Sequence, residues 1–299
     1  MLSSPFTREA MPLLVAVGVT LVGCGAQSSV MRTGEDPYRD SESAGEVLFI
    51  DVSKEVGPDL SGPVFAMAAA DVEGDGWLDI VFTNHHGIGL LNNHHGSFQF
   101  TPNLLHPFEE DTHGMSWLDF DRDGRLDLLV TVGADRGFGG GGNLLMLGEG
   151  QGAASFRLST ALPEVLTDVR GRGRCVTLAD FNRDGWLDIA LMNAVQEDRV
   201  NRLAGGRAQG FDDWSTSFGL DHIRAEGLVG VYLSVDGPPV FVAYGAGADG
   251  GKIFCFAEDT GFHDCSSALG LVKPSSSVQA VVPGDYDNDG DLDLYFVRG

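Results

Sequence analysis

The sequence predicts an all-β fold built from repeated units of about 50 residues, each with several short strands and one acidic loop. A nine-residue acidic pattern that occurs four times is the first reason for this prediction. Short apolar runs of strand length flank the copies, and a second motif recurs in phase with the first. The composition is that of a folded chain, because 43% of the 299 residues are apolar and supply a core.

The acidic pattern places oxygen-bearing side chains at positions 1, 3, 5 and 9 of each copy and a Gly at position 6. Alternate residues of a tight loop direct carboxylates at one point, as Ca²⁺ requires, and the Gly permits the sharp turn. We therefore expect about four Ca²⁺ sites, with the backbone carbonyl of position 7 as a further ligand. The candidate ligands are Asp71, Glu73, Asp75, Trp77, Asp79, Asp119, Asp121, Asp123, Arg125, Asp127, Asp180, Asn182, Asp184, Trp186, Asp188, Asp285, Asp287, Asp289, Asp291 and Asp293.

The segments around these loops are expected to be strands. The apolar runs 78–82 and 126–132 are bounded by Gly and Asn and have the length of buried strands. A helix–loop–helix calcium site would need a bidentate Glu at position 12, where this chain has Phe82, Val130 and Leu191. Each acidic loop is therefore predicted to join two strands.

A second motif of the form Phe-x-Asp-x-Ser marks the outer part of the units. It begins at Phe49, Phe211 and Phe262, with weaker copies at Phe98 and Phe156. Together the two motifs define units with the size of one propeller blade. Five units are visible, because residues 231–244 keep a strand, a turn and a strand but lack the ligands; this fourth unit is expected to hold no metal.

The loops and strands resemble FG-GAP/VCBS repeats, the blades of integrin-α-like propellers. Residues 284–295 (GDYDNDGDLDLY) are similar to the version in ASPIC/UnbV-type secreted bacterial proteins. The resemblance covers residues 46–299 and implies a calcium-loaded β-propeller. It implies little about the ligand, since such propellers serve adhesion, glycan recognition and enzyme scaffolding. Glu73 replaces the usual Asp and makes the first site bulkier.

The sequence leaves two architectures open for the last unit, which has only two strands before Gly299. In one, the unpaired outer-strand sequence at residues 48–53 completes the last blade. In the other, the propeller is incomplete or truncated and has an open edge that invites pairing with another chain.

Residues 1–23 are predicted to be a lipoprotein signal peptide. The apolar stretch 11–23 is too short to span a bilayer and has the length of a signal-peptide core. It ends in Leu-Val-Gly-Cys, which resembles a lipobox and implies lipidation of Cys24 and a lipid anchor in the cell envelope, at the outer membrane or cell surface. An ordinary secretory signal is the alternative. Residues 24–45 are polar and are expected to form a flexible tether.

The remaining cysteines lie within the repeats. Cys255 and Cys265 flank a predicted turn at residues 258–261, so a cross-strand disulfide is expected in an oxidising compartment, with two reduced thiols as the alternative. Cys175 lies in an apolar strand and is expected to be a buried thiol.

Charge and motifs favour a binding protein. A formal net charge of −24 argues against nucleic acid as a partner, because polyanion binding needs Lys and Arg. The sequence contains no nucleophile elbow, Walker loop or His-Glu-x-x-His motif. We therefore expect a non-catalytic propeller that binds a glycan or a protein. A propeller scaffold of a carbohydrate-active enzyme, a polysaccharide lyase or hydrolase, is the alternative, and the oligomeric state is left open.

Histidine and arginine residues point to one candidate ligand face. Six of the eight His fall in the first unit, and those at 85, 86, 106 and 113 are expected on the face opposite the calcium loops. They predict either a transition-metal site or polar turns. The same face should receive basic residues that contact an anionic or polar partner, unless these are only solvated loop charges. The candidate ligand-face residues are His113, Asp135, Arg136, Arg170 and Arg172.

Overall fold

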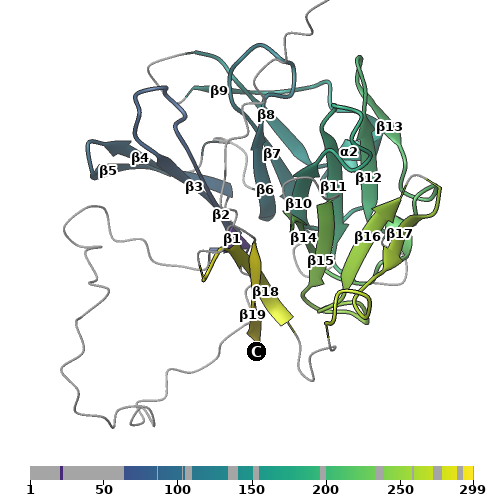
Figure 1. The fold of residues 1–299 in the computed structure, drawn as a ribbon. Coiled ribbons are helices and arrows are strands. Elements are labelled where there is room, and N and C mark those ends of the chain that lie inside the picture. Colours follow the sequence, from purple (N-terminus) through teal and green to yellow (C-terminus); the bar gives the residue numbers. More distant parts are fainter. Residues whose placement is uncertain are drawn as a thin grey trace, which may run out of the picture.

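The computed structural model shows a chain dominated by strands (Figure 1). It describes residues 21–22 and 64–298, except 86, 103, 105–109, 134–140, 151–154, 196–199, 234–238, 258, 272–277 and 288–291.

Each of the first four units is one antiparallel sheet whose strands follow in chain order. The first sheet contains β1 (Leu21–Val22), β2 (Ala66–Ala70), β3 (Asp79–Asn84), β4 (Gly87–His94) and β5 (Ser97–Thr101). The second contains β6 (Thr112–Leu118), β7 (Asp127–Val132), β8 (Leu144–Gly148) and β9 (Phe156–Leu158). The third contains β10 (Gly173–Ala179), β11 (Asp188–Asn193), β12 (Arg202–Gly206) and β13 (Phe211–Asp213). The fourth contains β14 (Gly227–Tyr232), β15 (Pro239–Tyr244), β16 (Ile253–Ala257) and β17 (Gly261–Asp264).

The fifth unit contains β18 (Val278–Gly284) and β19 (Asp293–Arg298), paired antiparallel. Helical structure among the described residues is limited to α2 (Glu164–Thr167) and the 3₁₀ turn η2 (Leu220–His222). The predicted all-β class and the succession of propeller blades are confirmed, and so is the position of the fourth unit. No helix in the described part of the chain is long and apolar enough to cross a bilayer.

Neighbouring blades pack in chain order. β2 contacts β6, β6 contacts β10, β10 contacts β14, and β15 contacts β18. β1 contacts both β18 and β2, so the first and last units lie on the two sides of this short strand (Figure 1). Leu21 and Val22, which the sequence places in the signal peptide, pair here with Met67 and Ala66. Residues 48–53, expected as a closing strand, lie outside the described residues, as do Cys24 and the tether 24–45.

Burial explains why the second strands of the second, third and fourth blades are so apolar. Every residue of β7, β11 and β15 is buried, because neighbouring blades cover both faces of these strands. The outer strands β9 and β13 have no fully buried residue. The largest buried cluster joins the third, fourth and fifth units and includes Phe181, Phe241 and Tyr244. Blade-to-blade packing therefore supplies the core.

The described cysteines have two states. The Cys255 and Cys265 sulfurs are bonded in a disulfide that joins β16 to the residue after β17, with Cα atoms 5.8 Å apart. Cys175 is a buried free thiol in β10, and the Tyr244 hydroxyl donates a 3.4 Å hydrogen bond to its Sγ. The disulfide closes the outer hairpin of the fourth blade.

Candidate metal centres

The acidic loops connect the first two strands of the first, second, third and fifth units, as predicted. In three of them the aspartate at position 1 holds the turn together. Asp119 Oδ1 and Oδ2 accept hydrogen bonds from the backbone N–H groups of Asp123 and Gly124, both at 3.0 Å. Asp71 and Asp180 accept the equivalent bonds at 2.8 to 3.0 Å. The repeated sequence pattern therefore gives one repeated backbone geometry.

Glycine at position 6 is required by this geometry. Gly76, Gly124 and Gly185 have φ angles of +89°, +84° and +87°, in the left-handed region that L side chains rarely adopt. The next backbone N–H, at position 7, donates to the carboxylate of position 5, as Trp77 does to Asp75 at 2.8 Å. This bond orients the position-5 side chain within the loop.

The aspartate at position 9 begins the second strand and is almost fully buried in the first three loops, as Asp79, Asp127 and Asp188. Asp127 Oδ2 accepts from Phe120 N–H at 2.7 Å, and its Oδ1 accepts from Gly148 N–H in β8 at 2.9 Å. The equivalent pairs of bonds hold the other two carboxylates. Position 9 thus ties the loop to the third strand.

Burial raises the pKa of these position-9 carboxyl groups although backbone N–H groups oppose the shift. The shift is largest at Asp188, whose pKa rises to about 6. Nearby loop carboxylates raise the pKa further by repulsion. A cation beside these groups would relieve both effects.

Three carboxylates converge in two of the loops. Asp119, Asp121 and Asp127 each offer an oxygen within 4.8 Å of the other two. Asp285, Asp287 and Asp293 do the same in the fifth unit, where Asp289 and Asp291 lie outside the described residues. An all-oxygen donor set of this kind fits Ca²⁺, a hard cation with flexible geometry.

The second and third loops differ in the side chain that contacts the position-5 aspartate. The Arg125 guanidinium forms an ion pair with Asp123 and donates from Nε to the Gly148 carbonyl at 2.8 Å. In the third loop the Asn182 amide donates to Asp184 Oδ2 at 2.9 Å. No group of three acidic side chains converges among the described residues of that loop.

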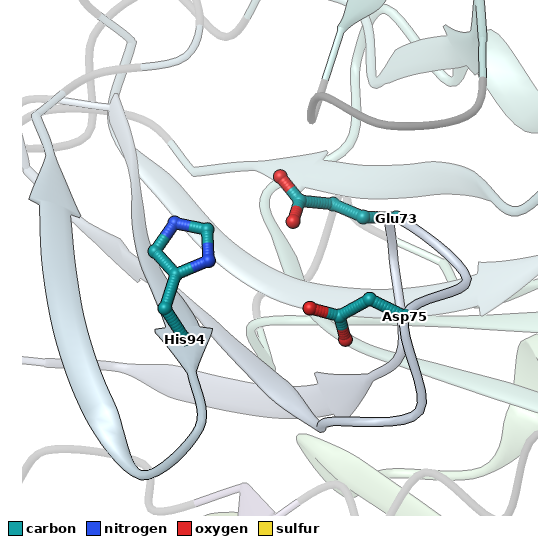
Figure 2. A group of neighbouring side chains, drawn as sticks. All are labelled: Glu73, Asp75 and His94. Atoms are coloured by element: carbon teal, nitrogen blue, oxygen red, sulfur yellow. The ribbon is translucent and has the colours of Figure 1, made fainter.

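The first loop brings together a different set. Glu73 and Asp75 converge with His94, the last residue of β4, within the same 4.8 Å (Figure 2). The sequence pattern predicted ligands only inside the loop, so His94 was not among the candidate ligands. In an antiparallel blade, however, the turn between strands three and four lies at the same edge as the loop between strands one and two. The strand order alone therefore could have predicted that His94 lies beside the acidic loop.

The opposite face of the first two blades holds a His–Asp–His cluster. Asp111 Oδ1 lies 2.6 Å from His85 Nδ1 and 3.2 Å from His113 Nε2. The Phe65 ring stacks on His113, with centroids 4.3 Å apart, and meets His85 edge-on. The structure therefore brings together two of the four histidines predicted on this face; His86 and His106 lie outside the described residues.

Burial and neighbouring charged groups together shift the pKa values of Asp111 and His113. Burial by itself would raise the pKa of Asp111, but hydrogen bonds and charge from His113 and His85 outweigh it and lower the pKa to about 2. Burial lowers the pKa of His113 and the nearby Arg174 charge adds to this, while Asp111 opposes it without reversing it. His113 is therefore biased towards the neutral imidazole.

The other candidate ligand-face residues are only partly described. Asp135 and Arg136 lie outside the described residues. Arg170 is exposed, while Arg172 is half-buried and its backbone N–H donates to Asn193 Oδ1 at 2.7 Å. Arg174, in β10, is the arginine whose charge acts on His113.

A pocket of about 320 Å³ lies between the second and third blades, beside the second acidic loop. Its lining includes Asp121, Arg122, Pro163 and Phe211. Arg122 donates to the carbonyl oxygens of Ala208 and Arg207, both at 2.9 Å, and its guanidinium lies 4.2 Å from the centre of the Trp186 ring. Arg122 thus connects the two blades beside this pocket.

Comparison with known families bears on the first two loops. Residues 71–130 match the FG-GAP-like repeat. This part of the chain is similar to such a repeat. It begins at the first residue of the first acidic loop and extends into β7, so it includes both loops of the first two blades. The later loops keep the same ligand positions outside the matched segment.

No curated protein matches the chain. One solved structure that the chain resembles is that of an Agrocybe aegerita lectin, described as recognising non-reducing terminal N-acetylglucosamine. The sequence identity is 18% and the TM-score 0.44, over 77% of this chain. The match spans 59% of the lectin chain.

Proposed function

We propose that this protein is a calcium-stabilised propeller of the cell envelope, exported and anchored through lipid on Cys24, which binds a glycan or protein ligand without catalysis. The convergence of Asp119, Asp121 and Asp127 carries the calcium part of the proposal. Three like charges so close together repel one another, and one of them is also buried away from water. A divalent cation is the simplest group that stabilises all three as carboxylates.

Calcium has a structural role in this proposal. Each loop fixes the connection between the first two strands, and its position-9 aspartate reaches the third strand of the same blade. An ion bound to the loop therefore stabilises three strands together. Ligand removal from such sites lowers stability by mass action.

The pocket beside Asp121 and Arg122 supports the ligand-binding part of the proposal. It combines apolar walls with one acidic and one basic side chain, as sites for small polar groups do. The face near His113, Arg170 and Arg172 is a second surface for an anionic partner. The net charge of −24 disfavours nucleic acid at either place.

Thermal melting in calcium and in EGTA tests the calcium part. We expect calcium to raise the Tm of the full chain, and Asp121→Asn to reduce that increase. Asp259→Asn is the matched control, because Asp259 is an exposed aspartate on the turn before β17. An equal Tm in calcium and in EGTA would contradict the proposal.

A glycan array, probed with and without calcium, tests ligand binding. We expect retention of at least one glycan class and weaker retention when the pocket variant Arg122→Ala is used. Membrane fractionation of a Cys24→Ser variant tests the anchor, and we expect its release into the soluble fraction. A Cys24→Ser protein that stays in the membrane would rule out the lipid on that residue.

The His85–Asp111–His113 cluster favours a second candidate, an enzyme that cleaves a polysaccharide. Asp111 Oδ1 lies 3.2 Å from Nε2 of the half-buried His113, and a carboxylate beside an imidazole is an arrangement used for general base catalysis. The test is cleavage of any glycan that the array retains. Cleavage that is lost in His113→Gln but kept in His222→Gln, at an exposed histidine, would establish this function in place of simple binding.

A further inference from the structure

We propose that Glu73, Asp75 and His94 form a binding site for a divalent transition metal such as Zn²⁺. In the first loop this site takes the place of the predicted calcium site, and the other acidic loops are not affected. It stands on the geometry of the first blade alone and does not depend on whether the other loops bind calcium. A metal held there joins the β2–β3 loop to the β4–β5 hairpin.

The three side chains come from two segments that face each other. Glu73 and Asp75 project from the loop, and the imidazole of His94 faces them from the end of β4 (Figure 2). One ligand atom of each lies within 4.8 Å of the other two. His94 and Asp75 are exposed and Glu73 is half-buried, so water can reach the site and complete the coordination.

The hairpin holds His94 in this position through its neighbour Asn93. The Asn93 backbone N–H donates to Asp79 Oδ1 at 2.8 Å, and its side-chain amide donates to the Leu78 carbonyl at 3.0 Å. His95 and Gly96 form the turn with φ angles of +56° and +90°, the conformation of a tight two-residue hairpin. The strand end beside the loop is therefore fixed before any metal binds.

Asn92 supplies an independent observation. It is only 8% exposed, and its side-chain Nδ2 donates to Glu73 Oε1. Its Oδ1 is buried and has no hydrogen-bond partner within the described part of the chain. Buried amide oxygens are normally paired. The Asn92 amide thus lies against Glu73 at the edge of the proposed site, with one polar atom that the described residues leave unsatisfied.

The donor set selects the kind of metal. Calcium prefers six or more oxygen ligands, whereas imidazole nitrogen with carboxylate oxygen suits Zn²⁺ and its neighbours. Zn²⁺ also accepts few protein ligands plus water. Two carboxylates balance the charge of the dication. The substitution of Asp by Glu at position 3 gives the longer side chain that reaches the Asn92 amide and the His94 side.

Calorimetric titration of the full chain with Zn²⁺, in millimolar calcium, tests the proposal. We expect binding that calcium does not displace, and a loss of affinity of more than about 10-fold in His94→Ala, since even outer-sphere partners of metal ligands cost 10- to 100-fold. His95→Asn is the matched control, because His95 is the adjacent exposed histidine and Asn tolerates its positive φ angle.

The outcomes separate this proposal from the proposed function. Equal Zn²⁺ affinity in His94→Ala and His95→Asn, or no Zn²⁺ binding by the wild type, overturns the transition-metal site. Because His94 is exposed, His94→Ala is expected to fold; Asp75→Asn, with the same predicted loss, provides a second variant. Calcium-dependent melting that persists in His94→Ala leaves the calcium proposal intact, whichever way the zinc titration ends.

Discussion

Replacement of Asp127 by Ala should destabilise the protein with or without calcium, whereas replacement of Asp121 by Ala should remove only stability that depends on calcium. The two residues belong to the same acidic loop and to the same group of converging carboxylates. They differ in burial, since Asp127 is 0% exposed and Asp121 is exposed. The comparison separates hydrogen bonding from metal binding.

The magnitude follows from the bonds at each residue. Asp127 accepts two backbone hydrogen bonds, at 2.7 and 2.9 Å, and bonds to a charged acceptor contribute roughly 1.5–3 kcal/mol each. Desolvation of the carboxylate offsets part of this, so we expect a loss of about 3 kcal/mol, or a fall in Tm of about 6–12 °C. With a Kd on the order of 10⁻⁴ M and ~1 mM calcium, one site contributes about 1.4 kcal/mol.

Differential scanning fluorimetry of the wild type and both variants, in calcium and in EGTA, measures the effects. Asp127→Asn keeps one acceptor oxygen and should fall between the wild type and Asp127→Ala. In EGTA, Asp121→Ala should have the same Tm as the wild type. An Asp127→Ala variant that melts like the wild type in EGTA, or an Asp121→Ala variant whose Tm falls equally in both buffers, would refute these two roles.

Four further predictions concern other parts of the fold. Arg122→Lys should lower stability by about 1 kcal/mol, because Lys keeps the charge but loses the paired bonds to two carbonyl oxygens; a chemical-denaturation midpoint unchanged from wild type would contradict this. Below pH 4 the folded state should lose the stability that Asp111 contributes, since its pKa is about 2 in the fold against an ordinary value of 3.8; Asp111→Asn should lack this part of the acid transition in a pH melt. Burial lowers the pKa of His113, so its protonation as the pH falls below 6.5 should also favour unfolding, and His113→Gln should flatten the melt there. Reduction of the Cys255–Cys265 disulfide, which spans 10 residues, should cost about 2–3 kcal/mol, and a Tm insensitive to reductant would exclude it.

The repeating units and their strand order could be predicted because the information is local. Alternating oxygen ligands, a Gly at position 6 and flanking apolar runs lie within about a dozen residues of one another. The structure has a loop between two strands at each copy, with Gly124 at the expected positive φ angle. The disulfide partners Cys255 and Cys265 were also close enough in sequence to be paired by a predicted turn.

The candidate sites depended on contacts that sequence spacing does not contain. Glu73 meets His94 only because β3 and β4 return the chain to the same edge of the blade. Asp127 has both oxygens occupied only because Gly148, on another strand, donates to it. From sequence both aspartates of the loop looked alike as ligands, and burial distinguished them.

The sequence by itself determined the local chemistry of this protein: which residues turn, which extend, and which offer oxygen to a cation. The tertiary structure decided which of those groups meet, as in the approach of His94 to the first loop and of His85 and His113 to Asp111. The physical reason is that backbone propensity acts over a few neighbouring residues. Burial, pKa shifts and ligand convergence arise only when strands distant in sequence pack against each other.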